Sequence, residues 1–157
     1  MQLLILFGAK YLYLVALAVA AVYVFMQPRK EQKRLLILAC IALPVCYLVA
    51  KVGSSIYYDP RPFVVGNFAP LVPHAADNGF PSDHTLLMAA IASVVYAHSR
   101  KVGALLWALA ILVGTSRVAA GIHHPLDIAG SIVIAAATTA GVYFLLQKYQ
   151  NKVWKNT

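Results

Sequence analysis

The chain has 157 residues, of which 61% are hydrophobic and 11% are charged, and its formal net charge is +8 at pH 7. This length allows one domain, and a composition this apolar lies far outside that of ordinary soluble proteins, so we expect a single membrane-embedded domain over 1–157. The positive charge is compatible with nucleic-acid binding, but the basic residues form no contiguous stripe, and we exclude that class.

Five nearly charge-free apolar runs follow one another along the chain, and a spanning helix needs about 20 mostly apolar residues. The third and fourth runs are short for a full span, which a helix tolerates when its outer end lies in the headgroup layer or lines a polar site. We therefore expect an all-α integral membrane bundle of about five transmembrane helices. The runs cover 3–26, 35–53, 82–97, 102–116 and 126–146.

The second run contains the two cysteines of the chain, Cys40 and Cys46. They lie six positions apart, on different sides of one helix, and no third thiol is available for a metal set. We expect neither a disulfide nor a zinc site.

Basic residues cluster after the first run at 29–34, between the third and fourth runs at 100–101, and in a short polar tail, 147–157. All three clusters fall on one side of the membrane when five helices alternate, and the positive-inside rule makes that side cytoplasmic. The amino terminus is then outside and the carboxyl terminus inside. The basic cluster that follows the first run also distinguishes it from a secretory signal peptide, in which the charge comes first.

The opposite side carries a long connection, 54–81, and a short one, 117–125. The long connection is rich in proline, glycine, aspartate and asparagine, which argues against regular helix and predicts an ordered extracytoplasmic loop or cap. Two further histidines, His74 and His124, lie here. For each of them, substrate contact and plain loop packing are both open.

Charged residues near the hydrocarbon cost about 2.5 to 3.5 kcal/mol each, so those that are retained usually have a partner or a task. Several polar residues lie at the outer ends of the predicted helices and would meet in one pocket if the helices pack as a bundle. They are Lys51, His84, Arg117 and Asp127, and the connections add Arg61 and His123.

These residue types fit phosphoryl transfer to a protein nucleophile. Arginine pairs with two phosphate oxygens and lysine supplies a point charge, so Lys51, Arg61 and Arg117 together can hold a phosphate. His123 and Asp127 are spaced i, i+4, so the carboxylate can hold one ring N–H and leave the other nitrogen basic toward phosphorus.

His84 is then free to protonate the leaving oxygen as a general acid. The stretch 79–84 has the glycine, proline and serine typical of a helix start, whose free N–H groups favour bound phosphate. We expect no metal or other cofactor, because the sequence contains no evident cluster of carboxylates or cysteines.

Three short motifs are Lys51 with Arg61-Pro62, Pro81-Ser82-Asp83-His84, and Ser116-Arg117 followed by His123 and Asp127. Together they resemble the three-part signature of the type 2 phosphatidic acid phosphatase (PAP2) superfamily. The resemblance covers the motif region 51–128. Its third part is the most specific, because Ser-Arg, five residues, His, three residues, Asp is reproduced without a gap.

The resemblance implies a helical membrane phosphatase with His123 as the nucleophile, Asp127 as its orienting partner and His84 as the acid. It implies that several of the other motif residues bind the substrate phosphate. These are Lys51, Arg61, Ser82 and Arg117, with Pro62, Asp83 and His124 as supporting residues.

The chain departs from the usual pattern of the superfamily in two motifs. Nine residues, 52–60, separate Lys51 from Arg61, which is more than usual, and Asp83 replaces a common glycine. Asp83 and the run 123–127 are similar to the bacterial undecaprenyl diphosphate phosphatase branch. Many members of the superfamily also have one span more, so a helix is expected to be missing at the amino end.

Our leading hypothesis is hydrolysis of undecaprenyl diphosphate to undecaprenyl phosphate and inorganic phosphate through a phosphohistidine at His123. The site would face outward from the inner membrane of a bacterium and serve recycling of the lipid carrier in cell wall biogenesis. The alternatives are a phosphatase for phosphatidate, phosphatidylglycerol phosphate or lipid A, a lipid phosphotransferase, and a membrane protein that binds lipid phosphate without turnover. The expected partners are the lipid substrate and membrane lipids, with no nucleic acid and no obligate protein partner.

Overall fold

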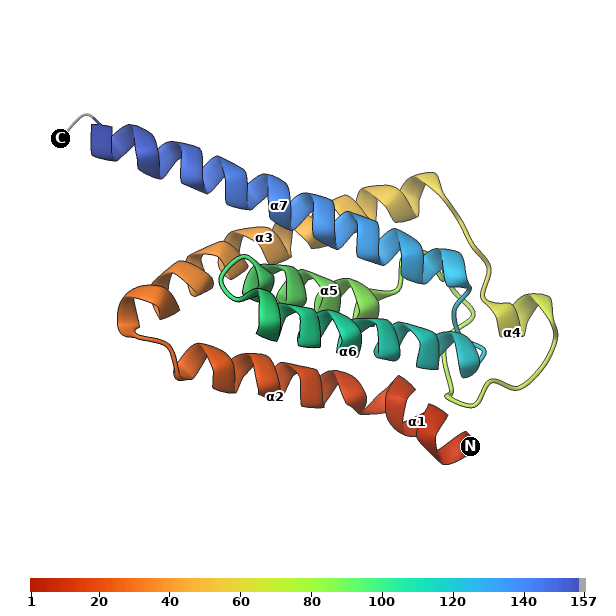
Figure 1. The fold of residues 1–157 in the computed structure, drawn as a ribbon. Helices are drawn as coiled ribbons and strands as arrows, with labels where there is room; N and C mark the ends of the chain where they lie inside the picture. The colour runs from red at the N-terminus through yellow and green to blue at the C-terminus, as the bar shows by residue number, and fades with distance from the viewer. Residues whose placement is uncertain (156–157) are drawn as a thin grey trace.

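The computed structural model describes residues 1–155, with side chains for 1–149, and every regular element in this part of the chain is a helix (Figure 1). The predicted all-α class is confirmed. The helices are α1 (Gln2–Lys10), α2 (Leu12–Phe25), α3 (Arg29–Ile56), α4 (Pro62–Val65), α5 (Asp83–Tyr96), α6 (Arg100–Ala119) and α7 (Pro125–Lys155).

Each of the five predicted runs is helical, but they differ in their capacity to cross a membrane. By length and hydropathy, α3, α6 and α7 can each span a bilayer alone. The first run is broken at Tyr11, where α1 and α2 meet at 49°, and the pair can form a fourth span. The remaining helix, α5, has 14 residues and is shorter than a full span.

The predicted polar tail, 147–157, is helical as far as the structure describes it. α7 continues without a break to Lys155, because nothing in this stretch is a helix breaker. The last two residues, 156–157, lie outside the described part of the chain, as do the side chains of Lys152 and Lys155, whereas Lys148 is exposed.

The short helix α5 occupies the centre of the bundle and contacts α2, α3, α6 and α7. Its buried residues point in all directions, which is typical of a helix enclosed by others. Two glycines of α6 let neighbouring chain segments approach closely. A Cβ at Gly103 would collide with the backbone of Tyr96, and one at Gly114 would lie 2.6 Å from Ile128.

The outer surface of the bundle carries large apolar side chains, which suits a lipid environment and not water. Among them are Leu36, Leu48, Leu112, Val133 and Leu145.

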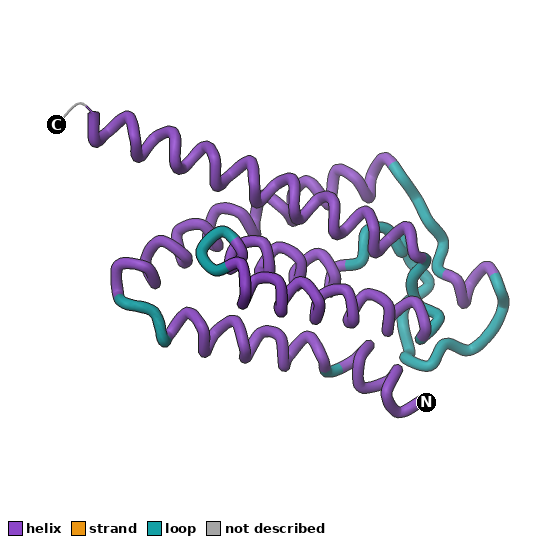
Figure 2. Tube along the Cα trace, viewed as in Figure 1, coloured by secondary structure: helices purple, strands orange, loops and turns teal. Residues whose placement is uncertain are grey.

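The two connections that carry the motifs lie at one end of the bundle (Figure 2). Within the long connection the prediction of no regular helix was wrong at Pro62–Val65, because Pro62 occupies the first helical position, where its missing N–H costs nothing. The side chain of Asn78 ties the two ends of this connection together. Its amide donates to Ser54 and Tyr57, and its oxygen accepts the N–H groups of Asp59 and Phe80.

Candidate active site

His123 and Asp127 form the buried centre of the site. His123 lies in the connection after α6 and is 2% exposed, and Asp127 lies in the first turn of α7 and is 0% exposed. Nδ1 of His123 is 3.0 Å from Oδ2 of Asp127, which also accepts the backbone N–H of His124 at 2.9 Å. Because a carboxylate only accepts, Nδ1 carries the proton and Nε2 is left as the basic nitrogen.

Arg61 approaches the free nitrogen of this imidazole. Its Nη1 lies 3.4 Å from Nε2 of His123 and donates to the carbonyl of Ile122 at 2.9 Å. Its Nε donates to Asp77 at 2.6 Å, so the guanidinium is anchored on two sides. A buried, anchored arginine beside a nucleophile is well placed to bind the oxygens of the group under attack.

Arg117, in the last turn of α6, is 4% exposed and is the second buried cation of the site. Its Nη1 donates to the carbonyl of Ala9 in α1 at 3.1 Å, and its Nη2 lies 3.5 Å from Nε2 of His74. Its Nε has no hydrogen-bond partner within the described part of the protein. Because buried N–H groups are nearly always paired, this one is available to a ligand.

These groups face a cavity of about 250 Å³ between α3, α5 and the long connection. Three cations and three imidazoles line it. They are Lys51, Arg61, Arg117, His74, His84 and His123. Five of the seven predicted catalytic and phosphate-binding residues therefore line one cavity. The other two do not line it: Asp127 lies directly behind His123 and bonds to its ring, and Ser82 lies away from the cavity wall.

Two members of this lining are held less tightly than the buried arginines. Lys51 is exposed, and its Nζ lies 5.4 Å from the ring centroid of Tyr47. Lys51 lines the cavity even though more residues than usual separate it from Arg61 in the sequence. The ring of His84 packs edge-on against Tyr13 of α2, with centroids 4.9 Å apart, which orients the imidazole.

Ser82 has a structural position that the motif alone did not predict. Its hydroxyl accepts from Thr85 at 3.2 Å, and its carbonyl accepts from Ser131 of α7 at 3.0 Å. Ser131 also donates to the carbonyl of Asp127 at 2.7 Å. The start of α5, which carries His84, is thus tied to the first turns of α7. Among the supporting residues, Asp83 lines the cavity, whereas Pro62 and His124 line a separate surface hollow next to it.

The ionisation of the loop groups favours a neutral nucleophile. Burial lowers the pKa of His123 below its usual value, and the charges of Arg117 and Arg61 lower it further, against the opposing hydrogen bond to Asp127. The pKa of His74 is lowered by burial and by the same two arginines. Burial raises the pKa of Asp77, but the hydrogen bond and charge of Arg61 outweigh it and bring the pKa below its usual value.

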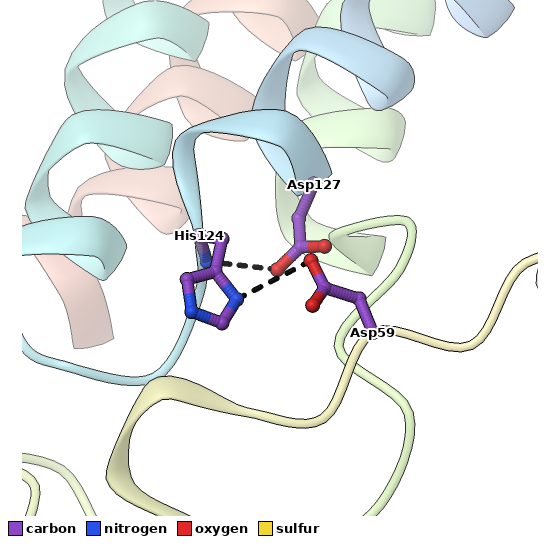
Figure 3. Close-up of side chains that lie close together, drawn as sticks. All are labelled: Asp59, His124 and Asp127. Carbon is purple, nitrogen blue, oxygen red and sulfur yellow. Dashed lines mark hydrogen bonds and ion pairs between the residues drawn. The ribbon is translucent and has the colours of Figure 1, made fainter. Parts of the chain in front are cut away.

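Behind the nucleophile lies a cluster that the sequence analysis missed. Asp59, His124 and Asp127 offer ligand atoms that all lie within 4.8 Å of one another, and Nδ1 of His124 is 3.3 Å from Oδ2 of Asp59 (Figure 3). The expectation that the chain has no such cluster was wrong, because Asp59 comes from the long connection, far from the other two in sequence. By donor type the set can hold a divalent cation.

The closeness of Asp59 to Asp127 in this cluster has two further consequences. Burial and the charge of Asp127 raise the pKa of Asp59. Gly79, whose N–H donates to the Asp59 carbonyl at 2.8 Å, leaves room for the pair, since a Cβ there would lie 2.9 Å from Oδ2 of Asp127. A glycine before a motif is a usable sequence signal for such a close approach.

Comparisons with known proteins show which family this chain resembles. The model of the PAP2 superfamily matches residues 33–151. The undecaprenyl-diphosphatase BcrC of Bacillus subtilis (strain 168) is 38% identical over 122 residues, which cover 76% of this chain and 61% of that protein. The putative undecaprenyl-diphosphatase YbjG of Escherichia coli (strain K12) is 31% identical over 136 residues, covering 86% of this chain and 69% of the relative.

Two solved structures share the fold. The crystal structure of Aquifex aeolicus LpxE has a TM-score of 0.71 at 27% identity and covers 91% of this chain and 87% of its own. That of a transmembrane PAP2 type phosphatidylglycerolphosphate phosphatase from Bacillus subtilis has a TM-score of 0.60 at 20% identity, with coverages of 94% and 84%, and supports the fold alone.

Proposed function

The chain belongs to the PAP2 superfamily and is a multi-pass membrane protein, and on that premise we propose that it hydrolyses undecaprenyl diphosphate to undecaprenyl phosphate and inorganic phosphate. The names of the two relatives at 38% and 31% identity support this substrate. The chain spans about 61% of the length of BcrC of Bacillus subtilis, so the substrate of this chain is our proposal.

One observation carries the reaction. His123 has its Nδ1 bound to Asp127, and its Nε2 lies at the cavity beside Arg61. This arrangement supports nucleophilic catalysis, because the tautomer is set and the basic nitrogen faces the place where a phosphate would be bound by two buried arginines.

The first step transfers the terminal phosphoryl group to the protein. Nε2 of His123 attacks the terminal phosphorus, and the bond from phosphorus to the bridging oxygen breaks. Undecaprenyl phosphate leaves with a proton from His84. Arg61 and Arg117, whose Nε is available, would stabilise the charge on the equatorial oxygens.

The second step restores the imidazole. Water that has lost a proton to His84 attacks the phosphorus of the phosphohistidine, and the phosphorus–nitrogen bond breaks. Inorganic phosphate leaves and His123 is again neutral at Nε2. One histidine thus acts as acid and then as base, as microscopic reversibility requires.

We also place the site on the extracytoplasmic side of a bacterial inner membrane, with the amino terminus outside. The basic residues at 29–34 and 100–101 flank the turns at the end of the bundle away from the site (Figure 1). α1 begins at the end that carries the site, and the last described turns of α7 lie at the opposite end. A cysteine introduced at Tyr58 of the long connection should react with an impermeant thiol reagent in intact cells. Protection until lysis would contradict this orientation.

The substrate is tested with purified protein in detergent. Phosphate release is measured with undecaprenyl diphosphate, phosphatidate, phosphatidylglycerol phosphate and lipid A, with His123→Ala as the blank. We expect the highest kcat/KM for undecaprenyl diphosphate. No release from a polyprenyl diphosphate, with turnover of one of the other lipids, would replace the proposed substrate by that lipid.

A further inference from the structure

An apolar groove between α3 and α5 adjoins the catalytic cavity. Its volume is about 330 Å³, within the range of small-ligand sites. Tyr47 and Asp83 line both the groove and the cavity, so the two spaces meet at these side chains. The other residues that line the groove are apolar, and none of them has a part in the proposed chemistry. They are Leu43, Cys46, Leu86, Leu87 and Ala90.

The groove runs away from the site along the helices. Leu43 lies one turn before Tyr47 in α3, and Ala90 lies about two turns after Asp83 in α5. At 1.5 Å per residue, two turns extend roughly 10 Å from the polar end of the bundle toward its middle. A molecule that occupies both spaces therefore has its polar end at His123 and its apolar end among the membrane-spanning helices.

The floor and the rim of the groove differ in exposure. Cys46, Leu86 and Ala90 are buried and form the floor. Tyr47 is 52% exposed and Leu87 is 38% exposed, so the rim is open on the outer surface of the bundle. An open rim allows a long chain to enter sideways from the bilayer and to continue beyond the groove into lipid.

We propose that this groove binds the hydrocarbon segment next to the phosphate of the substrate, namely the first isoprene units of a polyprenyl diphosphate. The proposal rests on the proposed function. Continuity with the cavity selects a ligand that has a phosphate head and an apolar chain, because such a ligand fills both spaces. The proposed function makes that chain a polyprenyl. Tyr47 lies where head and chain meet, and its ring already contacts the ammonium of Lys51 on the phosphate side.

Two substitutions that fill the groove test the assignment. Leu43→Trp and Leu87→Trp are compared with Leu112→Trp, which adds the same bulk to the outer surface of α6, where Leu112 is 52% exposed. The probes are dimethylallyl diphosphate, with one isoprene unit, and farnesyl diphosphate, with three. We measure the ratio of kcat/KM for farnesyl to that for dimethylallyl diphosphate.

We expect this ratio to fall about tenfold in both groove variants, which corresponds to roughly two CH₂ groups that lose their burial, and to stay within twofold of the unmodified protein in Leu112→Trp. An unchanged ratio in both groove variants would overturn the proposal. An equal fall in all three variants would also overturn it, because the loss would then follow from bulk at the lipid surface.

A binding readout separates this proposal from the proposed function. His123→Ala protein is irradiated with a farnesyl diphosphate analogue that carries a diazirine on the first isoprene unit, and labelled peptides are mapped by mass spectrometry. Label on 43–47 and 86–90 supports the groove even if the unmodified protein hydrolyses no polyprenyl diphosphate. Label confined to α1, α2 or α6 would reject the groove even if that hydrolysis is fast.

Discussion

The 3.0 Å contact between Nδ1 of His123 and Oδ2 of Asp127 determines which imidazole nitrogen faces the substrate cavity. Asp127→Asn retains the size of the side chain but can donate to Nδ1 and stabilise the wrong tautomer. We expect kcat to fall by about 10²- to 10⁴-fold, measured as phosphate release from undecaprenyl diphosphate. Thr115→Ala is the control, because its hydroxyl bonds only within α6. Comparable activity of Asp127→Asn and the control would refute the orienting role.

Replacing His123 and replacing His84 should block different steps of the reaction. His123→Ala should abolish turnover, and no acid-labile phosphoprotein should form, while the fold is retained. His84→Ala should slow the reaction by about 10²- to 10⁴-fold, because only proton transfer is lost. Labelled phosphate on the protein after a denaturing quench, together with circular dichroism, measures both effects. Full turnover by either variant would contradict the assigned role.

The pH profile should report the charges around His123. Only the neutral imidazole attacks, and burial and two arginines lower its pKa, so activity should hold at neutral pH and the acid limb should lie below pH 6.5. Arg61→Gln removes one of these charges, so the pKa rises and the acid limb of kcat/KM moves to higher pH. Arg61→Lys keeps the charge and should move the limb less. The substrate phosphate titrates in the same way with the unmodified protein and with both variants, so its titration does not cause a difference between their pH profiles. An acid limb at the same pH in Arg61→Gln would disprove the electrostatic coupling.

Gly79 should tolerate no side chain. A Cβ there would lie 2.9 Å from Oδ2 of Asp127 and 3.1 Å from the carbonyl of Asp59, so Gly79→Ala must displace the carboxylate that orients His123. We expect at least about a tenfold loss of kcat with helix content unchanged. The matched control is Gly141→Ala in α7, where a Cβ meets nothing within 4 Å. Equal activities of the two variants would show that the Asp127 carboxylate does not move.

Turnover should persist in a chelator. Lys51, Arg61 and Arg117 line the cavity and supply positive charge at the phosphate. The measurement is phosphate release with and without EDTA, with magnesium re-addition as the control. Complete loss that magnesium restores would instead assign an essential ion to Asp59, His124 and Asp127, and Asp59→Asn should then abolish the response to magnesium.

Much of this protein follows from local features of its sequence. The apolar runs predict where the helices lie, because spans need about 20 apolar residues whatever their neighbours. The i, i+4 spacing of His123 and Asp127 predicts their contact, because a turn leading into a helix brings these positions together. The arginine, lysine and histidine of the motifs indicate phosphate chemistry through their side chains alone.

Other features depended on how distant segments pack. The bend between α1 and α2 brings the Ala9 carbonyl to Arg117, and no periodicity in the sequence predicts this bond. The path of the long connection places Asp59 against His124 and Asp127, and it leaves the Ser82 hydroxyl on Thr85 and not in the cavity. Such contacts depend on loop geometry and on helix packing, which arise from many weak interactions across the chain and leave no short sequence pattern.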